Sequence, residues 1–298
     1  MKSIHISAAM LLFIFACTSK IQQSKTIAPS SIKDSRGNPM LLGIQSENVL
    51  RQTPFNSWYD PNYENYKIDS ATIDKISKDM KNKTFEIFMG TWCGDSKREV
   101  PRIFKILNYC KIPSSKIKLV MLDYRDSSYK QSPNHEEREM DIHRVPDLLV
   151  FENGTELGRI VESPVESLEK DLAKILSGNG YEPHYKAISW IQRQWKQRSL
   201  SELIADSIAV LKSLSALAED SYGLNTYGYV LCAAEQWEKA DLVFNWNAHL
   251  FPKEARVYNA LGDFYLSKHE MANAKMNYQK ALSIDPKNVN AKTRLEEL

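Results

Sequence analysis

In the C-terminal part of the chain, one pattern of small, aromatic and proline residues occurs twice in succession, with a period of 34 residues. Ser221–Glu254 and Ala255–Asn288 superpose at the positions that two packed helices need. The matched pairs are Tyr227-Gly228 with Leu261-Gly262, Leu231 with Tyr265, Ala240 with Ala274, Phe244 with Tyr278, and Pro252 with Pro286. Small residues let two helices approach closely, an aromatic ring fills the remaining gap, and proline ends the second helix. The period therefore predicts stacked helical pairs.

This pattern resembles the tetratricopeptide repeat, and Ala255–Asn288 fits it at nearly every signature position. Ala187–Asp220 is interpreted as a decayed third copy, because Trp190 fits but Gln194 and Asp206 occupy positions that prefer small residues. The resemblance implies a concave surface that binds a segment of another protein. The alternative is that the repeats only stabilise the rest of the chain.

The middle of the chain alternates between strand and helix patterns instead. Strands are predicted at Thr84–Met89, Lys118–Asp123, Asp147–Glu152 and Glu156–Val161, the last two joined by an Asn153-Gly154-Thr155 turn. Helices are predicted after Asp69 or Ser70, at Ser96–Cys110, at His135–Ile142, and from Ser163, with Pro164 first and Glu166 completing a capping box. This order predicts an α/β domain of three layers.

Two motifs in this domain resemble the thioredoxin superfamily, across roughly residues 80–178. The stretch GTWCGDSKREVP places Trp92-Cys93-Gly94 and Pro101 at the family's spacing. Val145-Pro146 precedes a strand that ends in Asn-Gly, and the resemblance implies that Pro146 is cis and faces the cysteine. The two resemblances imply a thioredoxin-like α/β domain, with a central mixed sheet flanked by helices, followed by an all-α domain of tetratricopeptide-type repeats.

The site has one cysteine where thioredoxin-type reductases use two. The resolving position is Ser96, and an alcohol cannot carry out thiol–disulfide exchange. Cys110 lies at the far end of the same predicted helix, roughly 20–25 Å away, beyond the reach of a disulfide. It is better explained as a small buried apolar residue. A bridge from Cys93 to Cys232 in the repeats is the remaining, disfavoured pairing.

Cys93 keeps features that make a thiol reactive. It precedes a helix, whose unpaired amides favour a thiolate, and Lys97 and Arg98 add positive charge, whereas Asp95 opposes them. Ser96 is expected to donate a hydrogen bond to the sulfur, and Trp92 is expected to be the exposed aromatic beside it. The resemblance also implies a buried acid six residues before the cysteine, but this chain has Ile87 there. The two-thiol cycle is therefore not expected.

An aromatic segment precedes this domain, with Phe55, Trp58, Tyr59, Tyr63 and Tyr66 close together. Packing against the following domain is favoured over a ligand site.

The N-terminus predicts export. Lys2 is followed by the apolar run Ala8–Ala16, which has the length of a signal-peptide core and is too short to span a bilayer. The run ends at Cys17 and resembles a bacterial lipobox, which implies lipid attachment at Cys17. The alternative is a plain cleaved signal with an incidental cysteine. Either alternative predicts an exported protein, and lipid attachment would make it a membrane lipoprotein of the cell envelope that faces the periplasm.

The chain is accordingly divided into a signal peptide (1–17), a flexible tether (18–39), the thioredoxin-like domain with its extension (40–178), a linker and helical pair (179–220), and repeats with a closing helix (221–298). The four cysteines and six histidines are scattered, so no metal site or cofactor is expected. The net charge of +2 gives no sign of a nucleic-acid partner.

Three functions remain open at this point. In the first, Cys93 forms mixed disulfides with client proteins, and an external small thiol or reductase resolves them. Val145 and Pro146 would then present the backbone edge that pairs with the client. In the second, the protein is a redox-inactive adaptor that holds a partner through the cis-proline loop and the repeats. The third, a peroxide-reducing cysteine, lacks the Pro-x-x-x-Thr-x-x-Cys environment.

Overall fold

A mixed sheet of five strands forms the centre of the N-terminal part in a computed structural model, which describes residues 32–34 and 36–298. Its order is β1-β3-β2-β4-β5. The strands are β1 (Gly43–Gln45), β2 (Thr84–Met89), β3 (Ile117–Met121), β4 (Asp147–Glu152) and β5 (Thr155–Val161). β2 pairs parallel with β3 and antiparallel with β4. This mixed sheet with helices is compatible with the domain type that the sequence predicts.

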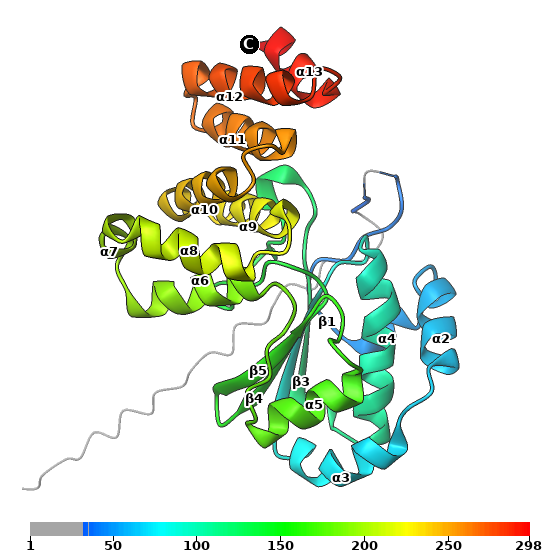
Figure 1. Ribbon diagram of the computed structural model, residues 1–298. Coiled ribbons are helices and arrows are strands. Elements are labelled where there is room, and N and C mark those ends of the chain that lie inside the picture. The colour runs from blue at the N-terminus through cyan, green and yellow to red at the C-terminus, as the bar shows by residue number, and fades with distance from the viewer. Residues whose placement is uncertain (1–31, 35) are drawn as a thin grey trace, which may run out of the picture.

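Helices cover one face of this sheet (Figure 1). They are α1 (Glu47–Leu50), α2 (Asn56–Asn65), α3 (Ser70–Met80), α4 (Gly94–Tyr109) and α5 (Leu168–Ser177). The amphipathic α4 buries Val100, Ile103 and Phe104 against the strands, as its 3.6-residue spacing predicts. Phe55 and Tyr59 are buried in the same core, so the aromatic segment packs as expected.

The segment between β3 and β4 covers the opposite face, where Phe88, Val120 and Leu149 pack against Ile142 and Val145. The helix predicted at His135–Ile142 is wrong. The chain makes successive turns there, and His135, Glu139 and Asp141 have positive φ angles, which an α-helix does not allow. The Glu137 carboxylate accepts hydrogen bonds from the backbone N–H and the hydroxyl of Ser132, which holds these turns together.

The start predicted for α5 is also wrong. The N-cap is Ser167, whose hydroxyl accepts from the backbone N–H of Lys170 at 3.2 Å, and not Ser163. The backbone N–H groups of Val165 and Glu166 instead donate to the Asp171 carboxylate. This segment is therefore a turn that α5 holds in place, not the first turn of the helix.

The C-terminal part is helical throughout and leads away from the sheet (Figure 1). Its helices are α6 (Lys186–Gln197), α7 (Leu200–Ala205), α8 (Ser207–Leu217), α9 (Ser221–Ala233), α10 (Trp237–Leu250), α11 (Ala255–Ser267), α12 (Met271–Ile284) and α13 (Val289–Glu297). Residues 187–220 form three helices and not the predicted pair, because the chain breaks at Asp206 between α7 and α8.

The two 34-residue stretches fold as the predicted helical pairs α9–α10 and α11–α12. A Cβ placed on Gly228 would lie 2.4 Å from the Phe244 ring, and one on Gly262 would lie 2.4 Å from the Tyr278 ring. Each glycine therefore lets the partner helix bring its aromatic ring against the backbone, as the pairing of small and large residues predicts.

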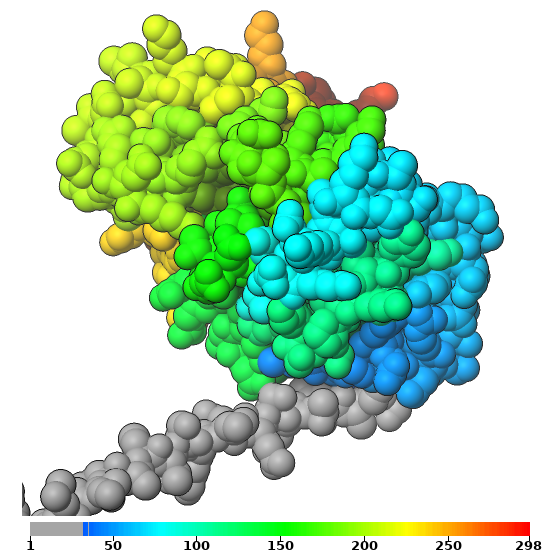
Figure 2. Space-filling view, turned by 90° about the horizontal axis from the view of Figure 1, so that it is seen from below, coloured from blue at the N-terminus to red at the C-terminus, as the bar shows by residue number. Residues whose placement is uncertain are grey.

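The helical part lies directly against the sheet part (Figure 2). The His143 ring, from the segment before β4, lies edge-on to Tyr185 and Tyr227 of the helical part, at centroid distances of 5.5 and 5.8 Å. The Gln192 side chain of α6 donates to the backbone oxygen of Asp141 at 2.8 Å. The segment before β4 is thus held between the sheet and the repeats.

The predicted signal peptide, Cys17 and most of the tether lie outside the described residues. Within residues 32–34 and 36–298, none of the helices has the length and apolar character that crossing a membrane requires.

Candidate functional site

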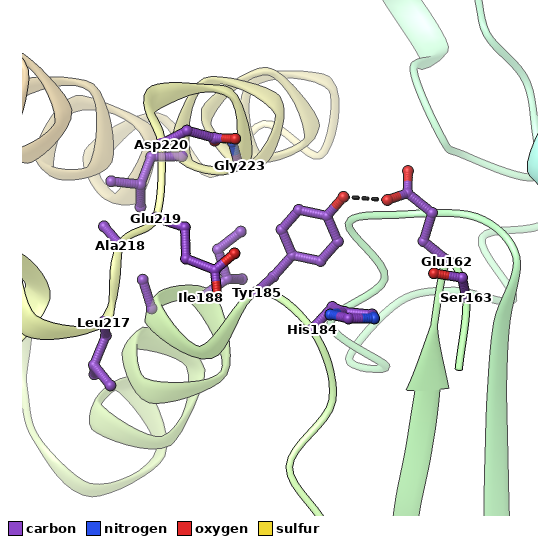
Figure 3. Close-up of a pocket in the computed structure, with 12 residues that line it drawn as sticks. Glu162, Ser163, His184, Tyr185, Ile188, Leu217, Ala218, Glu219, Asp220 and Gly223 are labelled. Atoms are coloured by element: carbon purple, nitrogen blue, oxygen red, sulfur yellow. Dashed lines mark hydrogen bonds between the residues drawn. The ribbon is translucent and has the colours of Figure 1, made fainter. Parts of the chain in front are cut away.

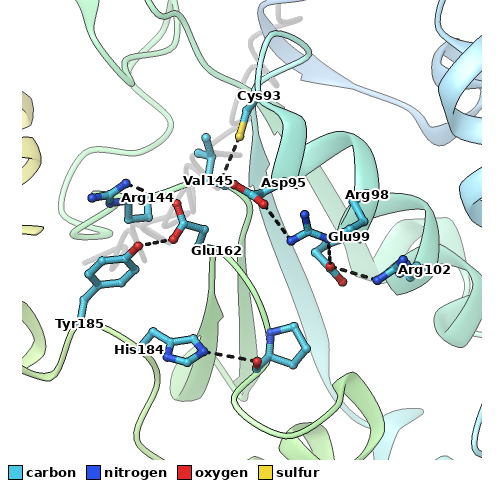
Figure 4. Close-up of polar contacts among 11 residues, drawn as sticks. Cys93, Asp95, Arg98, Glu99, Arg102, Arg144, Val145, Glu162, His184 and Tyr185 are labelled. Atoms are coloured by element: carbon cyan, nitrogen blue, oxygen red, sulfur yellow. Dashed lines mark hydrogen bonds and ion pairs between the residues drawn. The ribbon is translucent and has the colours of Figure 1, made fainter. Parts of the chain in front are cut away.

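Cys93 is the N-cap of α4, with extended backbone angles (φ −86°, ψ 128°). Its carbonyl accepts the first helical hydrogen bond from the Lys97 N–H, and the thiol is half-buried. The sulfur points to the segment before β4 and donates to the Val145 carbonyl oxygen at 3.2 Å (Figure 4). The peptide bond between Val145 and Pro146 is cis, as predicted. The two motifs, 52 residues apart, therefore meet at the sulfur.

Trp92 is half-buried beside the thiol, which differs from the expected exposed position. Its indole N–H donates to the Leu122 carbonyl at 2.9 Å, and its ring lies 6.1 Å from the ring of Tyr124. A Cβ on Gly90 would lie 2.3 Å from the indole, so glycine is required for this packing. The hydrogen bond to Leu122 and the close packing against Gly90 thus fix the Trp92 ring beside the thiol.

Ser96 is fully buried in the first turn of α4. Its hydroxyl accepts from the Gly90 N–H at 3.3 Å. The hydrogen bond expected between Ser96 and Cys93 is not formed among the described residues, because this hydroxyl is turned to the backbone of the preceding loop. Ser96 thus ties the first turn of α4 to the preceding loop, and the Cys93 sulfur is hydrogen-bonded to Val145 instead.

The charges near the thiol are largely paired with each other (Figure 4). Arg98 contacts Asp95 at 2.8 Å and Glu99 at 2.6 Å, and the hydrogen bond that it donates to the Glu99 carboxylate raises the pKa of the Arg98 guanidinium. Arg102 contacts the same Glu99 carboxylate at 3.1 Å. The sequence predicts opposite effects of the Arg98 and Asp95 charges on the thiol. In the structure these two side chains instead pair with each other, in one row of ion pairs along α4.

A second cluster of polar side chains packs against the segment before β4, and the sequence analysis did not predict it. Lys130 is buried there, and burial lowers its pKa to about 7. Arg144 contacts Glu162 at 3.3 Å, and the Tyr185 hydroxyl donates to the same carboxylate (Figure 4). No periodic pattern marks these residues, since they lie on loops and meet only in the fold.

The other two described cysteines differ from Cys93. Cys110 is buried against Met80, and burial raises its pKa to about 11. Burial raises the pKa of Cys232 to about 12. All three described cysteines are free thiols, so the disfavoured bridge between Cys93 and Cys232 is not formed.

Among the cavities where the sheet part meets the helical part, two are lined by Tyr129 or by Glu162. One, of about 580 Å³, opens between the turn after β3 and the repeats. It is lined by Asp126 and Tyr129 on one side and by Tyr229, Cys232, Phe264 and Arg294 on the other. The second, of about 250 Å³, is lined by Glu162, His184, Tyr185 and Asp220 (Figure 3). The described residues contain no cluster of acids, histidines and cysteines that could hold a metal ion.

A comparison with known protein families identifies one of the predicted helical repeats. Residues 255–288 match the tetratricopeptide repeat. The match covers α11 and α12 and the turn after them, which is the segment whose sequence fits the signature best. No curated protein matches the chain. Since tetratricopeptide repeats generally bind partner proteins, the match indicates a role in protein–protein interaction.

Proposed function

We propose that this chain is an exported, membrane-tethered, thioredoxin-like protein that uses the single thiol of Cys93 for disulfide exchange with client proteins recruited by its repeats. The observation that carries the proposal is the contact of the Cys93 sulfur with the Val145 oxygen, 3.2 Å away beside Pro146. A half-buried thiol at a helix N-terminus, facing a backbone edge, has the setting in which a substrate chain can be held across it.

The exchange needs only one protein thiol. The Cys93 thiolate attacks one sulfur of a client disulfide, the new bond joins the two proteins, and the other client sulfur leaves as a thiolate. An external small thiol or reductase then attacks the mixed disulfide, becomes bonded to the client sulfur and returns Cys93 to its reduced form. Ser96 cannot take this second step, because its hydroxyl neither exchanges with disulfides nor faces the sulfur.

The repeats are proposed to select the client. The cavity of about 580 Å³ is lined both by the repeats and by Tyr129, and Cys93 is one of the groups whose charge acts on Tyr129. We propose that a client segment bound in that cavity extends past Tyr129 to the thiol. We propose that the predicted signal peptide directs this activity to the bacterial cell envelope, and that a lipid on Cys17 serves as the membrane anchor.

A redox-inactive adaptor is the second candidate. Two observations favour it: Ser96 stands at the resolving position, and the fully buried Ile87 stands where relatives carry an acid. In this function the cis-proline loop and the repeats hold a partner, and Cys93 is a relic or a sensor.

Reaction of the native full chain with oxidised glutathione separates the two candidates. For the thiol function we expect Cys93 to form a mixed disulfide faster in the native protein than in urea, and added thiol to reverse it. Cys93→Ser is the matched control and should form no adduct at this position. Native Cys93 that reacts no faster than unfolded Cys93 would favour the adaptor.

A further inference from the structure

The segment between β3 and β4 buries a lysine without a counter-ion. Lys130 is 3 % exposed, and its ammonium has no carboxylate partner in the part of the chain that the structure describes. Burying an unpaired cation costs free energy, so such groups are uncommon outside functional sites.

The Lys130 ammonium holds the segment that the Cys93 sulfur contacts. It donates to the His143 carbonyl at 2.9 Å and to the Tyr129 hydroxyl at 3.0 Å. His143 lies two residues before Val145, whose carbonyl accepts from the sulfur. The ammonium and the sulfur therefore fix the two ends of one three-residue segment, residues 143–145.

The charges around Lys130 couple it to Cys93. Burial lowers the pKa of Lys130 most and Arg144 lowers it further, whereas Cys93 and Glu162 raise it. Cys93 is therefore one of the charged groups that act on the Lys130 ammonium. The remaining ionisable groups that face it are Tyr129, which has a raised pKa, and His143, whose pKa burial lowers and Lys130 lowers further.

We propose that Lys130 is a positioning residue for Cys93, which fixes the backbone that the sulfur contacts and favours the thiolate by its positive charge. The inference rests on the proposed thiol function and names the group that supports it. It also assigns a role to a buried cation that the packing of the domain alone does not require.

The test compares Lys130→Met, which keeps the length of the stem and removes the charge, with Lys130→Arg, which keeps charge and donors. The rate of Cys93 alkylation by iodoacetamide is followed against pH, with the modified peptide identified by mass spectrometry. Because a Lys130 whose pKa lies near 7 carries its charge only in part at neutral pH, we expect Lys130→Met to move the midpoint upward by about half a pH unit, equivalent to about threefold slower alkylation at neutral pH. Lys130→Arg should restore the midpoint toward that of the wild type.

Lys212→Met, at an exposed position of α8, is the matched control and should leave the midpoint unchanged. The proposal is overturned if Lys130→Met unfolds at the same denaturant concentration as the wild type and keeps the wild-type midpoint. A merely structural lysine would change the unfolding curve without moving the alkylation midpoint.

A second measurement leaves Lys130 in place, in case Lys130→Met does not fold. The titration of the Lys130 side chain is followed by nuclear magnetic resonance in the wild type and in Cys93→Ala. Reciprocal coupling requires the Lys130 midpoint to fall when the thiol is removed. An unchanged midpoint overturns the proposal.

These outcomes are distinguishable from failure of the proposed function. If Cys93 forms mixed disulfides but Lys130→Met does not move its alkylation midpoint, the thiol function stands without this role for Lys130. If the midpoint moves but no mixed disulfide forms, Lys130 supports a thiol that does not exchange.

Discussion

The sulfur of Cys93 donates a hydrogen bond to the backbone oxygen of Val145 at 3.2 Å, across 52 residues of sequence. This contact joins the N-terminus of α4 to the segment before β4. The same segment is held by Lys130 on one side and by the aromatic rings of Tyr185 and Tyr227 on the other. The surroundings of the thiol therefore depend on both parts of the chain.

We expect Cys93 to be the first cysteine of the described residues to be alkylated in the native protein. Burial raises the pKa of Cys110 to about 11 and that of Cys232 to about 12, so both remain protonated thiols at neutral pH. The thiolate is the reactive form. Limited iodoacetamide treatment at neutral pH, followed by peptide mass spectrometry, measures the order of modification.

Denaturant supplies the control, since all three thiols should then react at similar rates. Modification of Cys232 before Cys93 in the native protein would contradict the prediction.

Ser96→Cys should convert the single-thiol site into one that forms an internal disulfide. Position 96 lies in the first turn of α4, three residues after the N-cap Cys93, which is the spacing that a two-thiol site uses. We expect mild oxidation of Ser96→Cys to remove two free thiols per chain, and reduction of a model disulfide to turn over repeatedly when an added dithiol supplies the electrons. The thiol count and a disulfide-reduction assay provide the measurements.

The double variant Cys93→Ser/Ser96→Cys is the matched control and should lose no thiols. If Ser96→Cys keeps both thiols free under oxidation, the first turn of α4 does not bring the two positions together as described.

Gly228→Ala and Gly262→Ala should each destabilise the repeats by about 1–3 kcal/mol, because the new methyl group would overlap an aromatic ring. The overlapped rings are those of Phe244 and Tyr278, at 2.4 Å from the added Cβ in both cases. Denaturant unfolding followed by circular dichroism measures the change in the free energy of unfolding.

Gly94→Ala is the control, because a Cβ there meets no atom within 4 Å. It should be neutral or stabilise the protein by about 0.5 kcal/mol, through the lost freedom of the unfolded chain. Equal effects of all three substitutions would show that the close packing of the repeats does not contribute to stability.

Local signals in the sequence were sufficient for much of this fold. The place of Cys93 before a helix, the turn at Asn153-Gly154 and the small–large pairs of the repeats each depend on residues close in sequence or on a fixed period. The cis bond at Pro146 and its proximity to Cys93 came from the thioredoxin resemblance and match the geometry.

The failures come from contacts that pattern alone does not encode. The charged stretch at His135–Ile142 has a helical composition, but the Glu137 carboxylate binds back to Ser132 and holds turns instead. Lys130 was missed because its burial results from packing between loops that are distant in sequence. The segment at Ser163 satisfies a capping pattern, but Asp171 already binds the backbone amides that such a cap would leave free.

His143 should make the protein less stable as the pH falls. Its ring is 1 % exposed, neither ring nitrogen has a hydrogen-bond partner among the described residues, and burial lowers its pKa well below 6.5. The unfolded chain therefore binds a proton below about pH 6.5 that the folded chain does not bind, so stability is lost as the pH falls through that value. The loss approaches about 1.4 kcal/mol per pH unit for one proton.

His143→Phe keeps the aromatic packing against Tyr185 and Tyr227 and removes the titrating group. The free energy of unfolding, measured by denaturant titration between about pH 8 and pH 5, should fall more steeply for the wild type than for this variant. Asp147, whose pKa burial raises to about 7, contributes a slope of the opposite sign in both proteins, so only their difference tests His143. Parallel curves would mean that His143 accepts its proton in the folded state, and that the contact between the sheet and the repeats opens before the rest of the chain.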